Sequence, residues 1–371
     1  MKILLLLSRC DQTGVTTHTL DLTEALVALG HDVTVLIGKQ KGGGEPPESE
    51  MLYQKFLKTG ATIVPYPLPD GNSTIGKIKS VCAITGYLLC HRYDVLHVQS
   101  PYLSFIPWLL RRKFVSTLHV TDLVRCFYYK NATHLIAISK ETKDFAKRLY
   151  GYRDEDITIV HHGVSRRFST LLSDGEKVET KKTLGIPEEK IIVGLVGSVE
   201  RRKGHDVLLA AVRQMPQALR DRVHIVFLGS SKDGRTVDRL NGEIEHSGLK
   251  QQVSWFQYQP PEMFYKVFDI FALPSHQEGF GLVVLEAMLS GCCAVRSNTE
   301  GAYEQIEDGK SGYIFEDGEV DQLSGILSRL VEDAVLRKQV AKAGREKALR
   351  EFTSDVMARN TVEVYKKVIK R

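Results

Sequence analysis

The sequence of 371 residues contains no apolar run that approaches the ~18 residues required to cross a bilayer. Near its start the apolar run covers only residues 3–7, and Arg9 and Asp11 follow shortly after it. A secretory signal peptide has a longer apolar region, so this run is expected to form a buried strand instead. We therefore expect a cytoplasmic protein.

Cysteine is scarce and shows no metal-binding or redox spacing. The six cysteines are Cys10, Cys82, Cys90, Cys126, Cys292 and Cys293. They include no C-x-x-C pair, and the adjacent Cys292 and Cys293 fall in a predicted buried strand. A reducing compartment fits this usage best.

A strong charge of one sign is absent as well. The formal net charge is +5, and the basic residues are dispersed apart from 111–113 and 201–203. No zinc pattern or aromatic RNA-binding signature is present, so no nucleic-acid partner is expected. The first loop, 13–18, lacks the G-x-G-x-x-G arrangement of a dinucleotide-binding turn, which argues against an NAD enzyme.

Alternating apolar strands and helices predict an α/β protein of two Rossmann-like domains, because one hydrophobic core rarely serves a chain of this length. The expected strands are 3–7, 32–37, 61–66, 94–98, 114–119, 133–138, 157–160, 191–196, 223–228, 252–256 and 269–273. We expect a first domain over 1–165 completed by the helix 355–371, a linker over 166–190, and a second domain over 191–354. A Gly- and Pro-rich segment, 39–50, is expected to be a surface loop.

The stretch 269–291 carries the most specific pattern. A short apolar strand breaks at Pro274, crosses a loop with two glycines, and continues as an apolar helix that Gly291 ends. Such a loop presents backbone N–H groups at the positive end of a helix, which suits an anion. Glu286 lies inside the apolar helix and needs a polar partner. That partner is a ligand, a nearby Arg or Lys, or solvent at the helix edge.

The run Glu278-Gly-Phe-Gly-Leu-Val-Val-Leu-Glu286 resembles the E-x7-E signature of retaining glycosyltransferases of the GT-B architecture, family 4. The preceding Leu-Pro-Ser and the following Ala-Met-x-x-Gly match the family too. The resemblance implies that Glu278 acts catalytically near the donor sugar and that Glu286 binds the nucleotide ribose. It also implies two domains that face a cleft, with the last helix crossing back to the first domain. The implied contacts of the donor diphosphate and its surroundings are Gly279, Phe280, Gly281, Leu282 and Tyr258.

Histidines of the first domain extend the resemblance. Thr117-Leu-His119 matches the family's T-x-H, whose His faces the donor sugar, although a satisfied core histidine has the same sequence signal. His97 lies at the carboxyl end of a predicted strand, where ligands bind in open α/β sheets, and His18 opens the first helix. We take His18 and His97 as acceptor-side candidates. At His162 the family more commonly has Asn.

Further family positions lie in the loops after the first strand of each domain. Gly14 matches the family's Gly-Gly loop near the donor phosphates, whereas Thr13 departs from it. Lys203 occupies the family's own Lys position and is implied to stabilise the leaving diphosphate. Because Ser198 replaces the family's Arg, Arg201 and Arg202 become donor-binding candidates, and one of them is expected to turn inward beside Lys203.

The resemblance implies a transferase that moves a sugar from a nucleotide-diphosphate sugar to an acceptor hydroxyl on a glycan or lipid-linked acceptor, in polysaccharide or glycolipid biosynthesis. It implies retention of configuration through front-face attack. Metal-dependent glycosyltransferases usually carry an Asp-x-Asp triplet at the end of a strand. The triplet 154–156 lies in a polar stretch and is expected to be a solvated loop instead, so we expect no metal and no other cofactor. The alternatives are a GT-B sugar-nucleotide epimerase or phosphorylase, or a catalytically silent nucleotide-sugar-binding protein. Ser198 and Glu300 depart from the family and favour the silent alternative.

Two stretches, 75–89 and 105–113, combine apolar stripes with basic residues. This pattern is typical of elements at a membrane interface and predicts peripheral contact with the inner membrane face. The alternative is an ordinary core-facing helix with a solvated basic face.

Overall fold

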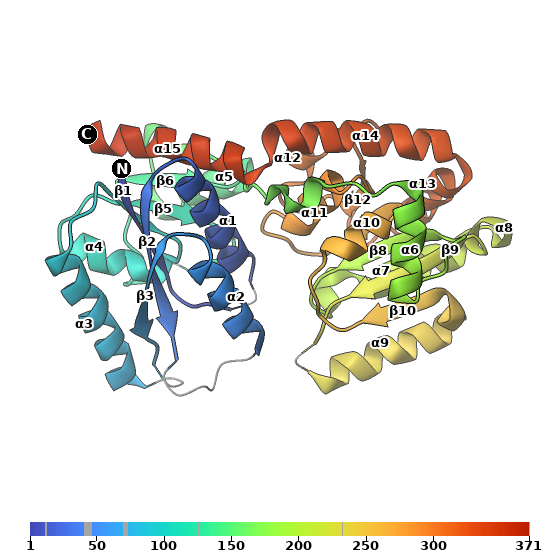
Figure 1. Ribbon diagram of the computed structural model, residues 1–371, viewed down its shortest axis with the longest axis horizontal. Helices are drawn as coiled ribbons and strands as arrows, with labels where there is room; N and C mark the ends of the chain where they lie inside the picture. The colour runs from blue at the N-terminus through green and yellow to red at the C-terminus, as the bar shows by residue number, and fades with distance from the viewer. Residues whose placement is uncertain (12, 41–46, 70–72, 125, 232, 371) are drawn as a thin grey trace. The chain divides into compact units, whose positions relative to one another are not determined.

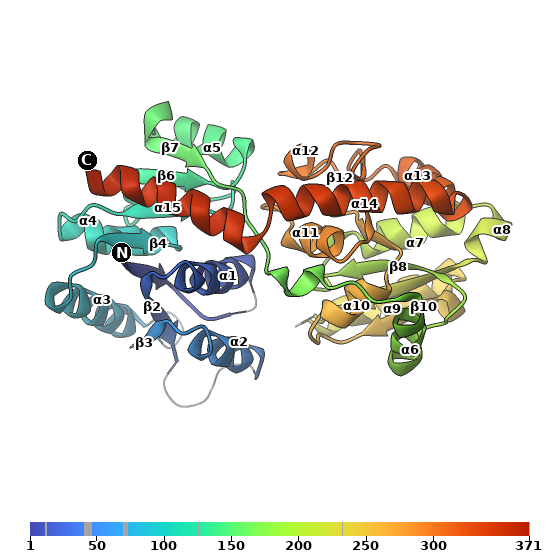
Figure 2. The same ribbon diagram turned by 45° about the horizontal axis from the view of Figure 1, so that its top comes forward.

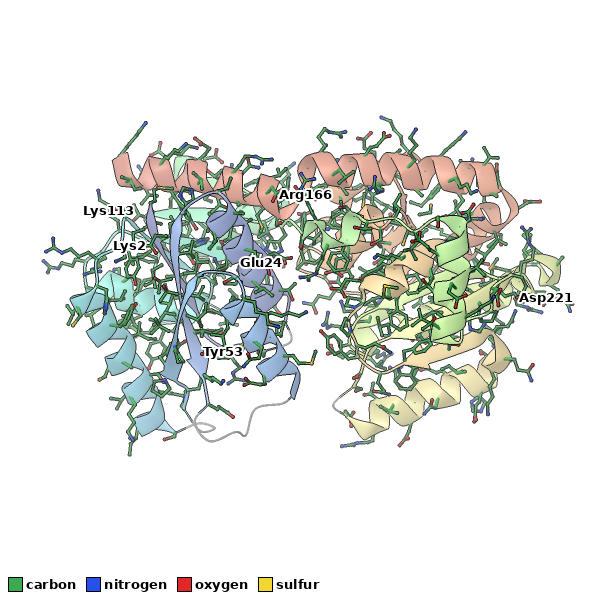
Figure 3. All side chains as sticks on the ribbon, in the orientation of Figure 1. Lys2, Glu24, Tyr53, Lys113, Arg166 and Asp221 are labelled. Atoms are coloured by element: carbon green, nitrogen blue, oxygen red, sulfur yellow. The ribbon has the colours of Figure 1, made fainter. Side chains whose placement is uncertain are left out.

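The computed structural model describes residues 1–11, 13–40, 47–69, 73–124, 126–231 and 233–370. The chain forms two compact units (Figure 1). Unit 1 consists of Met1–Ser165 together with Thr353–Arg371, and unit 2 consists of Arg166–Phe352. Arg166, labelled in Figure 3, is therefore the first residue of unit 2.

Unit 1 contains a parallel sheet of seven strands in the order β3-β2-β1-β4-β5-β6-β7. Its strands are β1 (Lys2–Leu7), β2 (Asp32–Lys39), β3 (Thr62–Pro67), β4 (Val95–Val98), β5 (Val115–Leu118), β6 (His134–Ala137) and β7 (Ile157–Ile159). Leu5 of β1 pairs with Val35 on one side and with His97 on the other. β1 is thus an interior strand with a neighbour on each side.

Both faces of this sheet are covered by helices, which explains the continuous apolar run of β1. Ile3, Leu5 and Leu7 pack into one core with helices α1 (Gly14–Ala28), α2 (Pro47–Leu57) and α15 (Ser354–Lys370). Leu4 and Leu6 point the other way, into a core with α3 (Thr74–Cys90) and α4 (Phe105–Leu109). Figure 2 shows α15 running beside α1. The remaining helical elements of the unit are η1 (Pro101–Ser104), α5 (Lys140–Tyr150) and η2 (Asp154–Asp156).

Unit 2 contains a parallel sheet of six strands in the order β10-β9-β8-β11-β12-β13. Its strands are β8 (Ile191–Val196), β9 (Val223–Leu228), β10 (Val253–Phe256), β11 (Ile270–Leu273), β12 (Cys293–Ser297) and β13 (Tyr313–Phe315). Its helical elements are η3 (Arg166–Ser169), α6 (Asp174–Leu184), η4 (Arg201–Lys203), α7 (His205–Gln214), α8 (Gln217–Arg220), α9 (Gly234–Ser247), η5 (Lys250–Gln252), α10 (Glu262–Val267), α11 (Leu282–Leu289), α12 (Ala302–Gln305), α13 (Val320–Glu332) and α14 (Ala334–Glu351). The predicted α/β class with two Rossmann-like sheets is confirmed.

The segment predicted as a linker, 166–190, differs from that expectation. Most of it is helical and belongs to unit 2. Ser173 and Glu176 form a capping box at the start of α6. Lys177 pairs with Asp269 at 2.8 Å, and the buried Lys181 donates to the carbonyls of two residues that precede β8. These bonds fix the segment to the sheet.

The surface loop expected over 39–50 is also shorter than predicted. Residues 47–50 already belong to α2, and 41–46 lie outside the described residues. In the part of the chain that the structure describes, no helix is both long and apolar enough to span a membrane.

Candidate active site

The site in unit 2 lies where its strand order reverses. β9 neighbours β8 on one side and β12 neighbours β11 on the other, so the loops that leave β8 and β11 lie next to each other at the carboxyl edge of the sheet. Lys203 is on the first loop and Glu278 on the second. Their side chains form an ion pair, with 2.6 Å between Lys203 Nζ and Glu278 Oε1, and both residues are buried. The structure therefore brings together two residues that the sequence singled out separately.

A glycine makes this approach sterically possible. Gly204 has φ +67°, and a Cβ atom there would lie 2.0 Å from the carbonyl oxygen of Pro274, at the start of the second loop. The backbone N–H of His276 also donates to the carbonyl of Arg202 at 2.8 Å. The two loops thus form one unit, and any side chain at position 204 forces them apart.

The electrostatics of the pair keep Glu278 ionised. Burial raises the pKa of its carboxyl group, but the charge of Lys203 and the hydrogen bond from its ammonium outweigh burial and hold the pKa below its ordinary value. A buried carboxylate with a bonded lysine at a topological switch point is typical of a functional site.

Glu286 finds its polar partner in a tyrosine. It is buried on α11, and its Oε2 accepts a hydrogen bond of 2.8 Å from the hydroxyl of Tyr265 on α10. Burial, with a further contribution from Glu286, raises the pKa of Tyr265 well above its ordinary value, so the hydroxyl stays protonated and donates. The observed hydrogen bond thus comes from a tyrosine hydroxyl, a group that was not considered from the sequence.

The glycine loop between the two carboxylates is held by a buried arginine. Arg296 on β12 is completely buried, and its Nη1 donates to the carbonyl of Phe280 at 3.2 Å. Gln305 donates to the same carbonyl at 2.6 Å and also accepts a bond from Arg296. A second nitrogen of Arg296 bonds the carbonyl of Glu300 at 3.0 Å. Gly281, with φ +77°, then starts α11.

Sequence reasoning missed Arg296 and Gln305. The available signal was an arginine inside an otherwise apolar strand, where an unpaired charge is costly to bury. The pattern did not reveal the partners, because they combine the Phe280 carbonyl of a loop distant in sequence with the Gln305 side chain and carbonyls that follow β12.

The neighbouring arginines do not turn inward as expected. Arg201 and Arg202 are both exposed, and Arg202 pairs with Glu200 at 2.7 Å between Nε and Oε2. Burial raises the pKa of Glu200, but bonds from Ser198 and Arg202, together with the charges of Arg202 and Lys203, outweigh it and lower that pKa. Ser198 therefore contacts Glu200, and Arg202 does not replace the family's arginine beside Lys203.

The other predicted donor contacts lie on several different elements. Tyr258 follows β10, and its backbone N–H donates to the Ser230 hydroxyl at 2.8 Å. Leu282 is half-buried in the first turn of α11, whereas Phe280 is buried. In unit 1, Gly14 is the first residue of α1 and is exposed, and Thr13 caps that helix by accepting from the Thr16 N–H.

Unit 1 carries a cluster of buried histidines beside the carboxyl ends of its strands. His18 comes from α1, His119 follows β5 and His162 follows β7. The ring centroids of His18 lie 4.9 Å from those of His119 and 4.3 Å from those of His162. Nδ1 of His119 is 3.1 Å from Nε2 of His162. His162 was noted in the sequence only as a departure from Asn.

His97 is linked to this cluster through Gln99, and both of its ring nitrogens lie within hydrogen-bond distance of hydroxyl groups of unit 1. Nδ1 is 2.7 Å from the Tyr365 hydroxyl on α15, and Nε2 is 2.7 Å from the Thr117 hydroxyl. The acceptor-side role expected for His97 stays a prediction, and it would require one of these bonds to be replaced. Gln99 lies between His97 and His119: its amide nitrogen is 3.3 Å from Nδ1 of His97, and its Oε1 is 3.1 Å from Nε2 of His119.

These histidines are neutral at physiological pH. Burial lowers the pKa of His18 to about 3, and burial with the charge of His18 lowers that of His97 to about 3. The same causes hold the pKa of His119 and of His162 well below the ordinary value.

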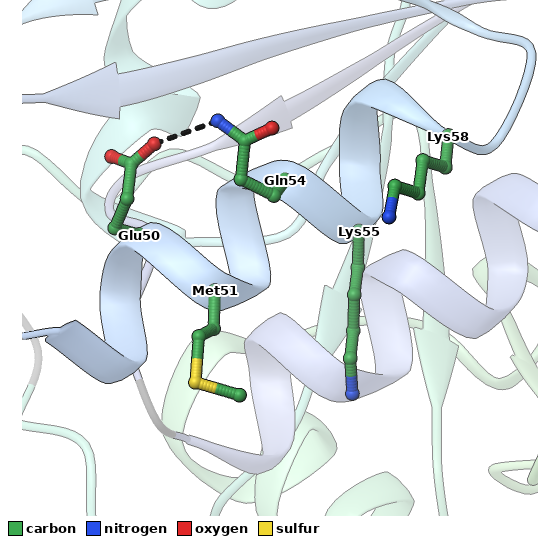
Figure 4. A pocket seen from close by; sticks show the side chains of 5 residues that line it. All are labelled: Glu50, Met51, Gln54, Lys55 and Lys58. Atoms are coloured by element: carbon green, nitrogen blue, oxygen red, sulfur yellow. Dashed lines mark hydrogen bonds between the residues drawn. The ribbon is translucent and has the colours of Figure 1, made fainter.

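A separate surface pocket of about 440 Å³ is lined by Glu50, Met51, Gln54 and Lys55 of α2 and by Lys58, which directly follows that helix (Figure 4). The amide of Gln54 donates to Glu50 at 2.8 Å. None of the residues singled out from the sequence lines it.

Two family models match the chain. Glycosyltransferase Family 4 matches residues 12–168, and Glycosyl transferases group 1 matches residues 176–347. A D-inositol 3-phosphate glycosyltransferase of Salinispora arenicola is 30% identical over 399 residues, covering 96% of this chain and 87% of the relative. The chain belongs to the group 1 glycosyltransferases of family 4.

Solved structures agree with the GT-B fold of this glycosyltransferase. A glycosyltransferase from Rickettsia africae superposes with a TM-score of 0.84 at 19% identity, covering 100% of this chain and 99% of that one. HepE of Anabaena, solved in complex with UDP, superposes with a TM-score of 0.81 at 20% identity, covering 99% of this chain and 100% of that one. The family expected from the E-x7-E pattern is confirmed.

Proposed function

We propose that this glycosyltransferase moves a sugar from a nucleotide-diphosphate sugar to an acceptor hydroxyl, with retention of configuration and without a divalent cation. The observation that carries the proposal is the buried ion pair between Lys203 and Glu278, next to the glycine loop and Glu286. These groups match, one by one, the charges and hydroxyls that such a donor presents.

Each part of the donor has a chemical counterpart in unit 2. The ribose hydroxyls would bond Glu286, whose carboxylate is oriented by Tyr265. The diphosphate would lie at the start of α11, where the glycine loop brings backbone N–H groups to the positive end of the helix. Lys203 would stabilise the negative charge that develops on the leaving diphosphate, a role that a metal ion fills in other transferases. That UDP binds HepE supports a nucleoside diphosphate as the ligand class.

The reaction proposed is front-face displacement. The bond between the sugar carbon C1 and the diphosphate oxygen breaks, and the acceptor oxygen bonds C1 on the same face. The acceptor proton passes to the departing phosphate oxygen. Glu278 is bonded to Lys203 at 2.6 Å, which weakens it as a covalent nucleophile and favours an orienting, charge-stabilising role near the sugar. For His119 we keep the role toward the donor sugar that the resemblance implies, and in that role one ring nitrogen would exchange its bond with His162 or Gln99 for one to the sugar.

The acceptor we propose is a glycan or a lipid-linked sugar at a membrane. On unit 1, α3 exposes Ile75, Ile78 and Leu89, although its Ile84 and Leu88 pack into the core. The alternative of an ordinary core-facing helix therefore accounts for only one side of α3.

An exposed aromatic group follows on α4 and the loop after β5. Lys130 Nζ lies 4.3 Å from the ring centroid of Phe127 and 4.6 Å from that of Trp108, and both rings are exposed. Aromatic rings with nearby lysines suit an anionic membrane surface.

In flotation with anionic vesicles we expect the protein to co-migrate at low salt, and Phe127→Ser to reduce co-migration. Tyr303→Ser, an exposed aromatic of unit 2, is the control and should have no effect; absence of co-migration by the unaltered protein refutes the membrane contact.

The two carboxylates give the test of the donor site. Glu286→Ala should weaken nucleoside diphosphate binding by ~1.5–3 kcal/mol, roughly ten- to over a hundred-fold, because it removes a bidentate contact to the ribose. Glu278→Ala should mainly slow transfer. Calorimetry with UDP, GDP and ADP measures the first effect, and Glu332→Ala, an exposed carboxylate on α13, is the control. Unchanged affinity in a folded Glu286→Ala protein refutes the ribose assignment.

The same proteins separate the alternative functions. An epimerase would convert the donor into a different nucleotide sugar, a phosphorylase would require free phosphate, and a silent binding protein would bind the donor without release of the diphosphate. Glu300, one of the two departures that suggested silence, contributes its backbone carbonyl to Arg296. A backbone carbonyl is present whatever the side chain at position 300. The change from Gly to Glu there is therefore weaker support for a catalytically silent protein.

A further inference from the structure

Within unit 1, one buried polar side chain lacks the partners that buried polar groups normally have. His18 is 4% exposed, and neither ring nitrogen has a hydrogen-bond partner among the described residues. Leaving a polar group unbonded in the interior costs free energy, so such an atom commonly marks a water or ion site. The ring of His18 packs against those of His119 and His162.

The three rings converge closely enough to share one ion. One nitrogen from each of His18, His119 and His162 lies within 4.8 Å of the others. Zinc bound by histidine has Zn–N distances of about 2.0–2.1 Å, which in a tetrahedron places the nitrogens about 3.3 Å apart. His119 Nδ1 and His162 Nε2 are already 3.1 Å apart. An ion would replace that hydrogen bond, and a nitrogen of His18, now within 4.8 Å of the other two, would have to turn from its tilted packing on His162 to complete the set.

The surrounding residues orient the ring of His119 for such a role. Gln99 Oε1 accepts from Nε2–H of His119 at 3.1 Å, which leaves Nδ1 as the nitrogen with the lone pair. That is the nitrogen directed at His162. Metal-binding histidines commonly donate their other N–H to an oxygen in this way, because the bond fixes the tautomer and the ring orientation. Gln99 is in turn 3.3 Å from the ring of His97 through its amide nitrogen.

We propose that His18, His119 and His162 form a binding site for a divalent transition-metal ion of the zinc class, which acts as an inhibitor of transfer. Three imidazoles favour Zn²⁺, Co²⁺, Ni²⁺ or Cu²⁺ over Mg²⁺ or Ca²⁺, which prefer oxygen ligands. Three protein ligands leave a fourth position for water. The inhibition rests on the proposed function, because the ion occupies the nitrogen of His119 and fixes the ring that would face the donor sugar.

The proposed ion differs in role from Lys203, which we propose stabilises the diphosphate in unit 2 without a metal. Its ligands come from α1 and from the loops after β5 and β7, and none of them is a carboxylate that could bridge a metal to a diphosphate. The transferase would therefore need no metal and yet respond to one.

Metal binding is tested first, without any assay of transfer. The full-length protein, freed of metal by a chelator, is titrated with Co²⁺ and followed by its visible absorption, and with Zn²⁺ by calorimetry. We expect one ion per chain with tetrahedral-type Co²⁺ bands. His162→Asn and His18→Gln should each weaken binding at least about 100-fold, whereas His161→Asn, the adjacent histidine outside the cluster, should leave it unchanged. Two ligand variants are used so that misfolding of one does not decide the result.

Inhibition is tested on the same proteins with a nucleotide-sugar turnover assay. Zn²⁺ should slow the unaltered protein and His161→Asn, a chelator should restore them, and His162→Asn should keep its own uninhibited rate. No uptake of Co²⁺ or Zn²⁺ by the unaltered protein, or unchanged uptake by both ligand variants, overturns the site. Zinc uptake without slower turnover overturns the inhibitory role. Metal binding that is lost in both variants, in a protein that turns over no donor, supports the metal site and contradicts the proposed function.

Discussion

Replacing Lys203 by Met removes one charge of the buried pair and keeps most of the side chain's apolar stem. Two unit charges 2.6 Å apart attract with about 6 kcal/mol at an effective dielectric constant of about 20. Desolvation of both groups offsets part of this attraction, and removing one partner of a buried pair typically costs ~3–5 kcal/mol because the other charge stays buried alone. We expect unit 2 of Lys203→Met to lose stability in that range at pH 7.

The pH dependence distinguishes this cause from simple repacking. In the unaltered protein the pKa of Glu278 is lowered, so its contribution to stability is complete above the unfolded pKa, near 4.5, and is lost as the pH falls through the folded value. Without Lys203, burial becomes the main influence and raises the pKa of Glu278. The variant's deficit is then largest at neutral pH and shrinks as Glu278 is protonated. Urea unfolding between pH 7 and pH 4 measures the difference between the two proteins.

Two further variants complete this experiment. Glu278→Gln combined with Lys203→Met removes both charges and should recover most of the loss. Lys310→Met breaks the exposed pair with Glu307 and should produce no measurable change, since solvent screens that pair. A Lys203→Met deficit below about 1 kcal/mol, the size found for surface pairs, or a deficit that stays constant with pH, refutes the description of a buried, coupled pair.

Two other predictions follow from the charges of unit 2. Burial lowers the pKa of His205 to about 3, so its contribution to stability is complete above pH 6.5 and is lost as the pH falls toward 3. As the pH falls from 7.5 to 5, the free energy of unfolding of the unaltered protein should therefore drop by about 2 kcal/mol more than that of His205→Gln. Urea unfolding at the two pH values measures this difference. The same pH dependence in both proteins contradicts a buried neutral histidine. Arg201→Ala and Arg202→Ala should each leave the affinity for UDP, GDP or ADP within about threefold by calorimetry, because both arginines are exposed; a tenfold loss in either indicates that the side chain turns inward when the ligand binds.

The strands were the most predictable part of the fold. Residues 191–196 and 223–228 were expected as strands and form β8 and β9 with the same ends, because both are short buried apolar runs bounded by polar residues and followed by glycine. α6 was missed because its residues are mostly charged and read as a linker. Its capping box, Ser173 with Glu176, was the local signal that could have revealed it.

The sequence predicted the parts of the site that depend on a local pattern. It predicted less well the contacts between residues that lie far apart in the sequence. Glu278 and Glu286 lie on one loop and helix, so their spacing carried the information. Lys203 and Glu278 are 75 residues apart, and their contact follows from the adjacency of β8 and β11. The histidine cluster likewise depends on the sheet, because His18, His119 and His162 follow β1, β5 and β7, which are far apart in the sequence. Exposure of Arg201 and Arg202 could not be read from sequence, because a short helical turn sets the direction of each side chain.

The most direct test of transfer with retention needs no knowledge of the acceptor. The protein is incubated with a panel of nucleotide-diphosphate sugars, and ¹H NMR follows the release of nucleoside diphosphate and the anomeric form of the first sugar product, with water or a simple alcohol as acceptor. We predict that one donor class releases nucleoside diphosphate, that the product keeps the donor's anomeric configuration, and that Glu278→Ala turns it over much more slowly. Inverted configuration, an altered nucleotide sugar, or binding without release for every donor contradicts the proposed function.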